Sequence, residues 1–216
     1  MRSIPLSKHI FLTGCDSNQE WLIPWFLSHI RKYTSLPIFF CNFGDVSKES
    51  IDLFDGTVSL SHSASHWFYK PQALMNSSAD KTVWIDLDCQ VKGSIDEIFS
   101  TIEPNRLAMA IDQPWSKRMN TIWHNSGIVG ISRPHPPILA KWEQACRDNP
   151  IRGDQETLHF LMTSELDKRI HISDIPNKYN VLRLQIDDGS VPSDVRVMHW
   201  TGTRGKDEIR RQMNEL

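Results

Sequence analysis

The fold is constrained most by a buried strand, an amphipathic helix and a second buried strand that follow one another near the start of the sequence. The apolar run at residues 9–13 predicts the first strand, and Gly14 ends it. Apolar side chains then recur at helical spacing over residues 19–33, and residues 37–43 form a second apolar run. A strand, a helix and a strand joined by short links make a βαβ unit. Such a unit predicts an α/β fold whose sheet is at least partly parallel.

The same alternation of strands and helices continues along the rest of the chain. Further strands are predicted at residues 53–61, 83–87, 107–111, 125–131, 170–175 and 195–199. Helices are predicted at residues 65–77, at 94–99 behind the cap residue Ser94, at 136–147, at 154–166 and from 206 onward. The 216 residues have the length of one ordinary domain. We therefore expect one α/β domain over residues 1–216, with a Rossmann-like, mixed and mainly parallel sheet flanked by helices.

Composition and charge exclude several classes of partner. The chain has 24 basic and 26 acidic residues, and neither sign forms a long run, which argues against binding of nucleic acid. The four cysteines lie far apart and form no CxxC pair, so a zinc ribbon or a redox dithiol is disfavoured. No stretch approaches the roughly 18 apolar residues of a transmembrane helix, and no signal peptide is recognisable. We expect a cytoplasmic protein with free thiols, and the sequence carries no signal for an oligomeric state.

Two carboxylates stand at the end of one predicted strand. Asp86 and Asp88 flank Leu87, and residues two apart in an extended chain point to the same side. Ligands of open α/β sheets collect at the carboxyl ends of the strands, so the two carboxylates can share a hard cation there. Mn²⁺ or Mg²⁺ suits such oxygen ligands and can bridge the phosphates of a nucleotide. The same acids could instead cap a neighbouring turn, and the pair alone leaves both interpretations open.

Four further short motifs accompany this pair in a defined order. They are WFYKPQAL at residues 67–74, NSG at 125–127, DQ at 154–155 and HWTG at 199–202. Together with VWIDLD at residues 83–88, these motifs resemble the GT-A glycosyltransferases, and most of all family 8, the glycogenin and galactosyltransferase group. The resemblance covers most of the chain. It implies a GT-A fold in which about residues 1–100 bind the nucleotide and about residues 101–216 bind the donor sugar and the acceptor.

The resemblance implies a metal centre with three protein ligands. Asp86 and Asp88 match the DxD motif of the family, and His199 matches its histidine ligand near the C-terminus. Imidazole is a suitable third ligand for Mn²⁺, and Mg²⁺ is the other candidate cofactor. A lone histidine is more often a packed residue of the core or surface, and the glycines that follow His199 favour the ligand role.

The resemblance also assigns residues to the nucleotide sugar. Residues 13–16 follow the first strand, where family members hold the base and the ribose, and Trp21 is a candidate for stacking on the base. Glycines after His199 allow the backbone to approach a diphosphate, and Lys206 can supply a positive charge. At residues 203–206 the chain has TRGK where the family usually has a Lys-Pro-Trp segment. The predicted nucleotide-sugar contacts are Thr13, Cys15, Asp16, Asp86, Leu87, Asn125, Gly202 and Lys206.

Three residues match positions beside the reacting sugar. Lys70 corresponds to a basic residue near the donor sugar and the diphosphate, although a solvated helix face would also explain a lysine there. Asp154 corresponds to an acid that contacts sugar hydroxyls, and it could instead serve only as the cap of its helix. Gln155 corresponds to an amide on the reacting face. Because family 8 retains the anomeric configuration and no acid stands at that place, the resemblance favours a front-face reaction without a covalent intermediate.

The predicted function is the metal-dependent transfer of a hexose from a nucleotide diphosphate sugar, by family precedent a UDP-sugar, to a glycan or another hydroxyl acceptor. A non-catalytic carbohydrate-binding module on a degenerate transferase scaffold is a second hypothesis. A sugar nucleotidyltransferase is a third, but it should have a glycine-rich loop at residues 13–16, which the chain lacks. A zinc hydrolase built on His62, His66 and His124 would lack the glutamate of an HExxH motif.

Overall fold

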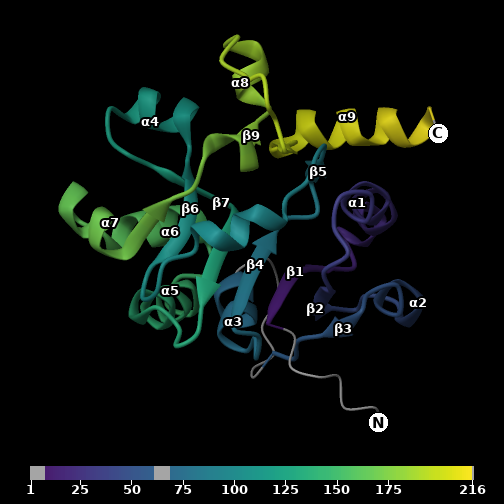
Figure 1. Ribbon diagram of the computed structural model, residues 1–216, viewed down its shortest axis with the longest axis horizontal. Coiled ribbons are helices and arrows are strands. Elements are labelled where there is room, and N and C mark those ends of the chain that lie inside the picture. The colour runs from purple at the N-terminus through teal and green to yellow at the C-terminus, as the bar shows by residue number, and fades with distance from the viewer. Residues whose placement is uncertain (1–7, 61–68, 216) are drawn as a thin grey trace.

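The molecule is built on a seven-stranded sheet with the strand order β3-β2-β1-β4-β7-β6-β8 (Figure 1). The computed structural model describes residues 8–60 and 69–215. The strands of this sheet are β1 (His9–Asp16), β2 (Ile38–Gly44), β3 (Gly56–Thr57), β4 (Lys81–Ile85), β6 (Leu107–Ile111), β7 (His124–Ser132) and β8 (Ile172–Asp174). Strand β7 is antiparallel to β4 and β6, and the other neighbouring pairs are parallel. The expectation of a mixed, mainly parallel sheet is therefore confirmed.

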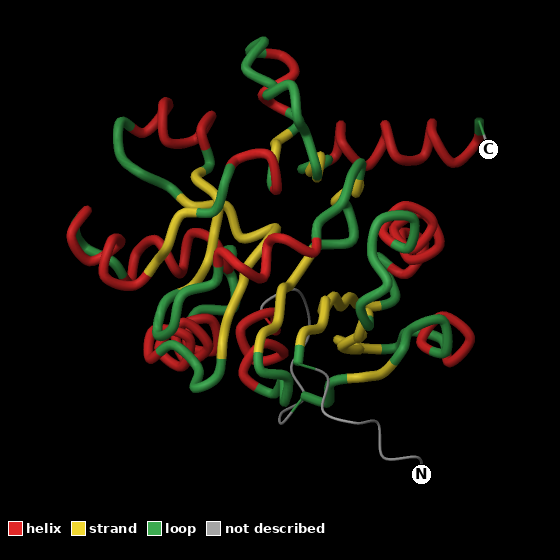
Figure 2. Tube along the Cα trace, in the orientation of Figure 1, coloured by secondary structure: helices red, strands yellow, loops and turns green. Residues whose placement is uncertain are grey.

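Helices surround this sheet, which runs through the middle of the molecule (Figure 2). The α-helices are α1 (Ile23–Ile30), α2 (Lys48–Ile51), α3 (Lys70–Met75), α4 (Gln113–Met119), α5 (Pro137–Asp148), α6 (Asp154–Leu161), α7 (Glu165–His171), α8 (Leu184–Asp187) and α9 (Gly202–Asn214). Within residues 8–60 and 69–215, the short 3-10 helices are η1 (Glu20–Leu22), η3 (Asp96–Thr101) and η4 (Asn177–Tyr179). In the part of the chain that the structure describes, no helix is both long and apolar enough to span a bilayer.

The strands bury side chains on both faces of the sheet. In β4, Val83 and Ile85 join one hydrophobic cluster with α1, η3 and α9, whereas Trp84 joins a second cluster with α3, α5 and α6. Alternate residues of a strand point to opposite faces, and burial of both sets explains why these strands read as continuous apolar runs. The sheet is thus covered on both sides, and its open end remains for ligands.

Some elements differ from the sequence prediction, for local reasons. The strand predicted at residues 83–87 ends at Ile85, and the one at residues 53–61 is reduced to β3. The helix predicted at residues 154–166 breaks into α6 and α7, because Ser164 and Asp167 form a capping box that starts a new helix. The helix expected at residues 94–99 is η3. Ser94 does not cap it, because η3 begins two residues later and has no side-chain cap.

A small second sheet joins the segment after β4 to the C-terminal part of the chain. Its strands are β5 (Cys89–Val91), β10 (Val197–His199) and β9 (Val181–Leu182), with β10 in the centre. Strand β10 pairs with β5 in antiparallel register so that His199 lies opposite Cys89. In addition, the backbone N–H of Trp200 donates to the carbonyl oxygen of Asp88 at 2.9 Å. This pairing places His199 beside the turn that follows β4.

Candidate active site

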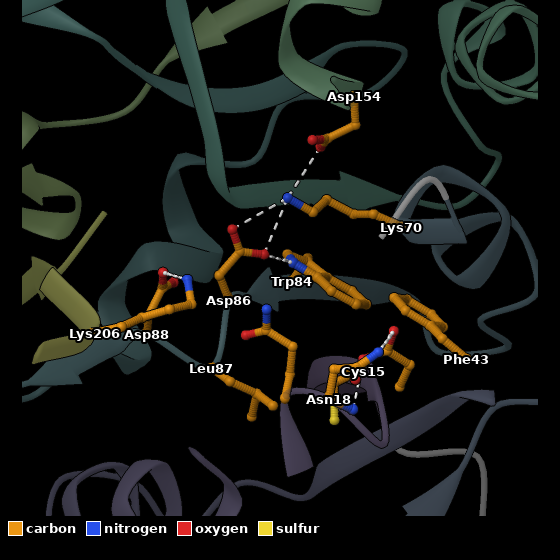
Figure 3. Close-up of a pocket in the computed structure, with 13 residues that line it drawn as sticks. Cys15, Asn18, Phe43, Lys70, Trp84, Asp86, Leu87, Asp88, Asp154 and Lys206 are labelled. Carbon is orange, nitrogen blue, oxygen red and sulfur yellow. Dashed lines mark hydrogen bonds and ion pairs between the residues drawn. The ribbon is translucent and has the colours of Figure 1, made fainter. Parts of the chain in front are cut away.

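The open end of the sheet holds a cavity of about 480 Å³ beside β1 and β4. Its polar wall is drawn in Figure 3, where the side chains of Lys70 and Asp86 point toward one another. The lining comes from the ends of β1, β2 and β4 and from α3, α6 and α9. The lining residues are Gly14, Cys15, Asp16, Asn18, Gln19, Phe43, Lys70, Trp84, Asp86, Leu87, Asp88, Asp154 and Lys206.

Asp86 and Asp88 lie in a tight turn and not on an extended strand. Strand β4 ends at Ile85, and the N–H of Cys89 donates to the carbonyl oxygen of Asp86 at 3.0 Å. The indole N–H of Trp84 donates to Oδ1 of Asp86 at 2.6 Å and fixes that carboxylate. The expectation that the two carboxylates point to one side because they lie on an extended strand is therefore wrong. Even so, both carboxylates line the cavity, because the turn brings them to the same side.

His199 presents Nε2 to these carboxylates. Nε2 lies 3.2 Å from Oδ1 of Asp88 and 4.0 Å from Oδ2 of Asp86. Nδ1 lies 3.1 Å from the amide oxygens of both Asn125 and Asn180, which can only accept a hydrogen bond. Nδ1 therefore carries the proton in the neutral imidazole, and Nε2 keeps its lone pair for a ligand. Hydrogen bonds of this kind orient histidine ligands in metal sites.

Gly127 makes room for the His199 ring. A Cβ atom at Gly127 would lie 2.2 Å from Cε1 and 2.4 Å from Nδ1 of His199. It would also lie 2.9 Å from Oδ1 of Asn125, which receives the N–H of Gly127 at 2.9 Å. No side chain fits at this position. The glycine of the NSG motif thus has a packing role that the sequence did not reveal.

Lys70 is buried at the centre of the site. Its Nζ lies 3.0 Å from Oδ1 of Asp86 and 3.0 Å from Oδ2 of Asp154, and it donates to the carbonyl oxygen of Ser126 at 2.8 Å. Burial lowers the pKa of Lys70, but Asp154 and Asp86 more than offset this and raise it above its ordinary value. Lys70 therefore stays charged, and the interpretation of this residue as part of a solvated helix face is wrong.

The N-terminus of α9 closes the cavity on another side. Nζ of Lys206 lies 3.2 Å from Oδ2 of Asp88. Two glycines permit this approach: Gly202 has a left-handed φ of 71°, and a Cβ at Gly205 would lie 2.0 Å from the carbonyl oxygen of Trp200. Thr201 makes no side-chain cap, so the first N–H groups of this 13-residue helix are available to an anion.

Burial and neighbouring charges shift the ionisation of the site. Burial raises the pKa of Asp88, but His199 and Lys206 more than offset this and hold it well below the usual range. Burial also raises the pKa of Asp86, against the opposing charge of Lys70. For His199, burial lowers the pKa, yet Asp88 and Asp86 together more than offset this, and the pKa lies above its ordinary value. The carboxylates are thus balanced by cationic groups of the chain itself.

The donor set fits a hard divalent cation. Two carboxylates and an imidazole whose Nε2 faces them are suitable ligands for Mn²⁺ or Mg²⁺. The ligand atoms of Asp88, Cys89 and His199 all lie within 4.8 Å of one another. Cys89 is the poorer ligand of the three, because burial raises the pKa of its thiol well above the ordinary value and a thiol binds metals as the thiolate.

A second cavity of about 330 Å³ adjoins the first, and the two share Asp86, Asp88 and Asp154 in their linings. It opens toward α4, α8 and the start of α9. The lining residues are Asp86, Asp88, Asp112, Trp115, Asn125, Ser126, Gly127, Asp154, Gln155, Glu156, Leu182, Leu184, His199, Thr201 and Gly202. The carboxylate turn therefore stands between two spaces, one beside the N-terminal strands and one beside the C-terminal half of the chain.

A hydrogen-bond network holds the amides of the second cavity. Nδ2 of Asn125 donates to Oε1 of Gln155 at 2.9 Å, and both amides donate to Oδ2 of Asp112 at 3.2 Å. Oδ1 of Asp112 accepts the backbone N–H of Trp115 at 2.9 Å and caps α4. Sequence reasoning missed Asp112. The signal was present, because this acid follows the strand at residues 107–111 as Asp86 follows β4.

The other predicted contacts of the nucleotide sugar divide into two groups. Cys15, Asp16 and Leu87 line the first cavity, whereas Thr13 is fully buried and lines neither one. Trp21 also lines neither cavity, and its ring lies under the guanidinium of Arg210 at 4.6 Å. The aromatic residues that line the first cavity are Phe43 and Trp84, whose parallel rings have centroids 5.9 Å apart. Sequence reasoning missed both of these rings, and also the polar residues Asn18 and Gln19.

Four residues named in the sequence prediction lie outside the described part of the chain. They are His62 and His66 of the zinc hypothesis and Trp67 and Phe68 of the first motif. The remaining residue of the zinc hypothesis, His124, is engaged elsewhere, because its Nε2 lies 2.7 Å from Oδ1 of Asp174.

The fold is similar to crystal structures of several glycosyltransferases. The galactosyltransferase LgtC, in complex with donor and acceptor sugar analogues, is 13% identical, with 96% of both chains covered and a TM-score of 0.66. A glycosyltransferase involved in glycosylation of the major capsid of PBCV-1 is 15% identical, with 96% of this chain and 99% of that chain covered and a TM-score of 0.61. GlyE of Streptococcus pneumoniae TIGR4 is 17% identical over 91% of this chain, with a TM-score of 0.63, and the match spans 56% of GlyE.

No protein-family model matches the sequence, and no curated protein does. The likeness is therefore one of fold. The chain has the GT-A fold of these glycosyltransferases, as the order of its motifs predicted.

Proposed function

We propose that the chain is a metal-dependent glycosyltransferase, nearest to family 8, that moves a hexose from a UDP-sugar to a hydroxyl group of a glycan or another acceptor. The observation that supports this most strongly is the meeting of Asp86, Asp88 and His199 where the two cavities join. Two distant segments of the chain are brought together there, on a fold that glycosyltransferases use. We also propose a cytoplasmic location, since the four cysteines are free and buried.

The proposed metal site uses Asp86, Asp88 and His199 to hold Mn²⁺ or Mg²⁺. When bound, such a cation supplies positive charge that stabilises a diphosphate leaving group. The chain adds its own charge to the same place. Lys206 and the first N–H groups of α9 would bind the outer oxygens of the diphosphate, because a helix N-terminus attracts anions. Lys206 can make this contact by giving up its present partner, Asp88.

We assign the nucleotide to the first cavity and the donor sugar and acceptor to the second. The first cavity is lined mainly by residues up to Asp88, and its volume is in the range of ligand sites. The ring of Phe43 and the side chains of Cys15 and Asp16 line it and can contact the base and the ribose. This assignment matches a division of one domain into a nucleotide-binding part, about residues 1–100, and a sugar-binding part, about residues 101–216.

The proposed transfer retains the anomeric configuration by a front-face route. The acceptor oxygen forms a bond to the anomeric carbon as the bond from that carbon to the diphosphate oxygen breaks, and the acceptor proton passes to the departing oxygen. Asp154, held by Lys70, would bind the sugar hydroxyls. Gln155 would present its amide to the reacting face, held by Asn125 and Asp112. Asp154 is committed to an ion pair, so a covalent intermediate on it is disfavoured.

Release of UDP from a panel of nucleotide sugars, with and without Mn²⁺, tests this function. We expect turnover of at least one UDP-hexose that Mn²⁺ supports and EDTA abolishes, and a loss of orders of magnitude in Asp88→Asn. Asp148→Asn is the matched control, because this exposed acid lies on α5 and lines neither cavity. Full activity of Asp88→Asn would overturn the proposal. Binding of sugars without turnover of any nucleotide sugar would favour the carbohydrate-binding module instead.

A further inference from the structure

The second cavity has an apolar wall that the proposed chemistry of the donor does not use. Trp115 of α4 lines it together with Leu182 and Leu184, and these side chains stand beside the carboxylates and amides of the reaction centre. Leu184 is 37% exposed although it is apolar. Helix α4 contains no buried residue, so Trp115 is not placed there to fill the core. A partly exposed tryptophan beside polar groups is a common platform for a ligand with an apolar face.

The position of Trp115 is fixed by contacts with the reaction centre. Its backbone N–H donates to Asp112, which also receives the Gln155 amide. Its ring meets the ring of Trp123 edge to face, with centroids 6.0 Å apart, and the guanidinium of Arg118 lies 5.0 Å from the ring centroid. These contacts thus fix the Trp115 ring relative to the amide of Gln155, which we place on the reacting face.

The facing wall on α8 is tied to α4. Gln185 is fully buried, and its Nε2 donates to Oε1 of Gln113 at 3.3 Å and to Oδ1 of Asn177 at 3.1 Å. Helices α4 and α8 both rise beyond the end of the sheet, and α8 lies above the start of α9 (Figure 1). Gln185 therefore fixes the wall that carries Leu184 relative to the wall that carries Trp115, and the space between them is preformed.

The polar side of the cavity carries an excess of negative charge. Asp86, Asp88 and Asp154 are paired with cationic groups, whereas the described residues that donate to Asp112 are all neutral. Glu156 also lines the cavity, and none of the described residues hydrogen-bonds to it or pairs with it. A carboxylate with no partner can accept hydrogen bonds from hydroxyl groups. It repels a ligand that brings a negative charge of its own.

We infer, on the basis of the proposed transfer function, that the second cavity binds the acceptor and selects a neutral pyranoside over an anionic one. The apolar face of the acceptor ring packs on Trp115, its hydroxyls donate to Glu156, and a uronic acid in the same place is rejected by the carboxylates. Trp115 and Glu156 are thus specificity-determining residues for the acceptor.

Matched pairs of acceptors test this selectivity: methyl glucoside against methyl glucuronide, and methyl galactoside against methyl galacturonide. Each pair differs in one carboxylate, and transfer is measured with the UDP-hexose that the wild-type chain turns over. For the acceptor that is used, we expect kcat/KM of the neutral member to exceed that of its uronide by at least about tenfold, with less discrimination in Glu156→Gln. Equal use of both members, or a preference for the uronide, would overturn the inference.

The Trp115 variants separate acceptor binding from folding. Trp115→Ala should raise KM for the neutral acceptor roughly three- to tenfold more than it lowers kcat, and Trp115→Phe should restore part of the loss. Lys117→Ala in the same helix is the matched control, because this exposed side chain lines neither cavity. Affinity for UDP with Mn²⁺ should stay at the wild-type value in each variant and verifies that the variant is folded.

Failure of this inference and failure of the proposed function are distinguishable. If the wild-type chain consumes no nucleotide sugar with any acceptor or with water, the transferase assignment fails. If it transfers a hexose but the acceptor KM of Trp115→Ala equals that of Lys117→Ala, only the acceptor assignment fails.

Discussion

Gly127→Ala should weaken metal binding although it replaces no metal ligand. The added Cβ would lie 2.2 Å from Cε1 of His199, whereas carbon atoms in contact are roughly 3.5 to 4.0 Å apart. The ring must therefore move by more than about 1 Å. It cannot do so while Nδ1 keeps its contacts with Asn125 and Asn180. Loss of such supporting contacts usually lowers metal affinity by about 10- to 100-fold, and the overpacking itself costs about 1 to 3 kcal/mol of stability.

The assay is Mn²⁺ affinity by calorimetry, with urea unfolding measured in parallel. Gly130→Ala, on the same strand β7 as Gly127, is the matched control, since its Cβ would crowd Ile102 and Ala108, at 2.9 and 3.0 Å, away from the carboxylates. We expect both variants to lose stability but only Gly127→Ala to lose Mn²⁺ affinity. In a His199→Ala background, Gly127→Ala should cost less stability, because the clash with the ring is gone and only the close contact with Asn125 remains. Wild-type Mn²⁺ affinity in Gly127→Ala would refute the reasoning.

Two further predictions concern the site, and a third concerns His159 of α6, whose ring stacks on Trp123. Lys70→Met should lower the free energy of unfolding by about 3 to 5 kcal/mol, because it leaves two carboxylates without their buried cation; a change below about 1 kcal/mol in urea unfolding would contradict this. Asn180→Ala should weaken Mn²⁺ binding in calorimetry about tenfold, because it removes an amide oxygen that orients His199. An unchanged affinity would contradict the supporting role of Asn180. Burial lowers the pKa of His159 from 6.5 to about 4, so the folded state binds fewer protons than the unfolded state between these values. Stability should therefore fall as the pH drops from about 6.5 to 4, and His159→Phe should flatten this part of the profile of unfolding midpoint against pH.

Local periodicity was sufficient to predict the strands that build the sheet. Strand β6 has the predicted bounds of residues 107–111, and β1 and β2 contain most of the predicted apolar runs. The break between α6 and α7 was not predicted, because apolar spacing continues across it while the capping box at Ser164 starts a new helix. The antiparallel insertion of β7 between β4 and β6 depends on pairing between distant segments, which a single sequence does not encode in its periodicity.

The site was predicted in part. The order of the motifs indicated that Asp86, Asp88 and His199 belong together, although the two acids lie in a turn and not on an extended strand. The supporting residues could not be found in this way. Asn180 lies in a short connection without a pattern, and its role arises because β9, which follows it directly, pairs with β10 and brings it to His199. Thr13 was assigned to the nucleotide from its place after the first strand, yet the structure places its side chain in the interior.

The central claim is that Asp86, Asp88 and His199 hold a cation that helps to bind a nucleotide diphosphate. Calorimetric titration of UDP with and without Mn²⁺ tests it most directly in wild type, His199→Ala and the control Asp148→Asn. The two ligands should bind cooperatively in wild type and in the control, each tightening the other by the same factor, and this coupling should disappear in His199→Ala. UDP binding that is indifferent to Mn²⁺ in the wild-type chain, or coupling that survives in His199→Ala, would contradict the claim.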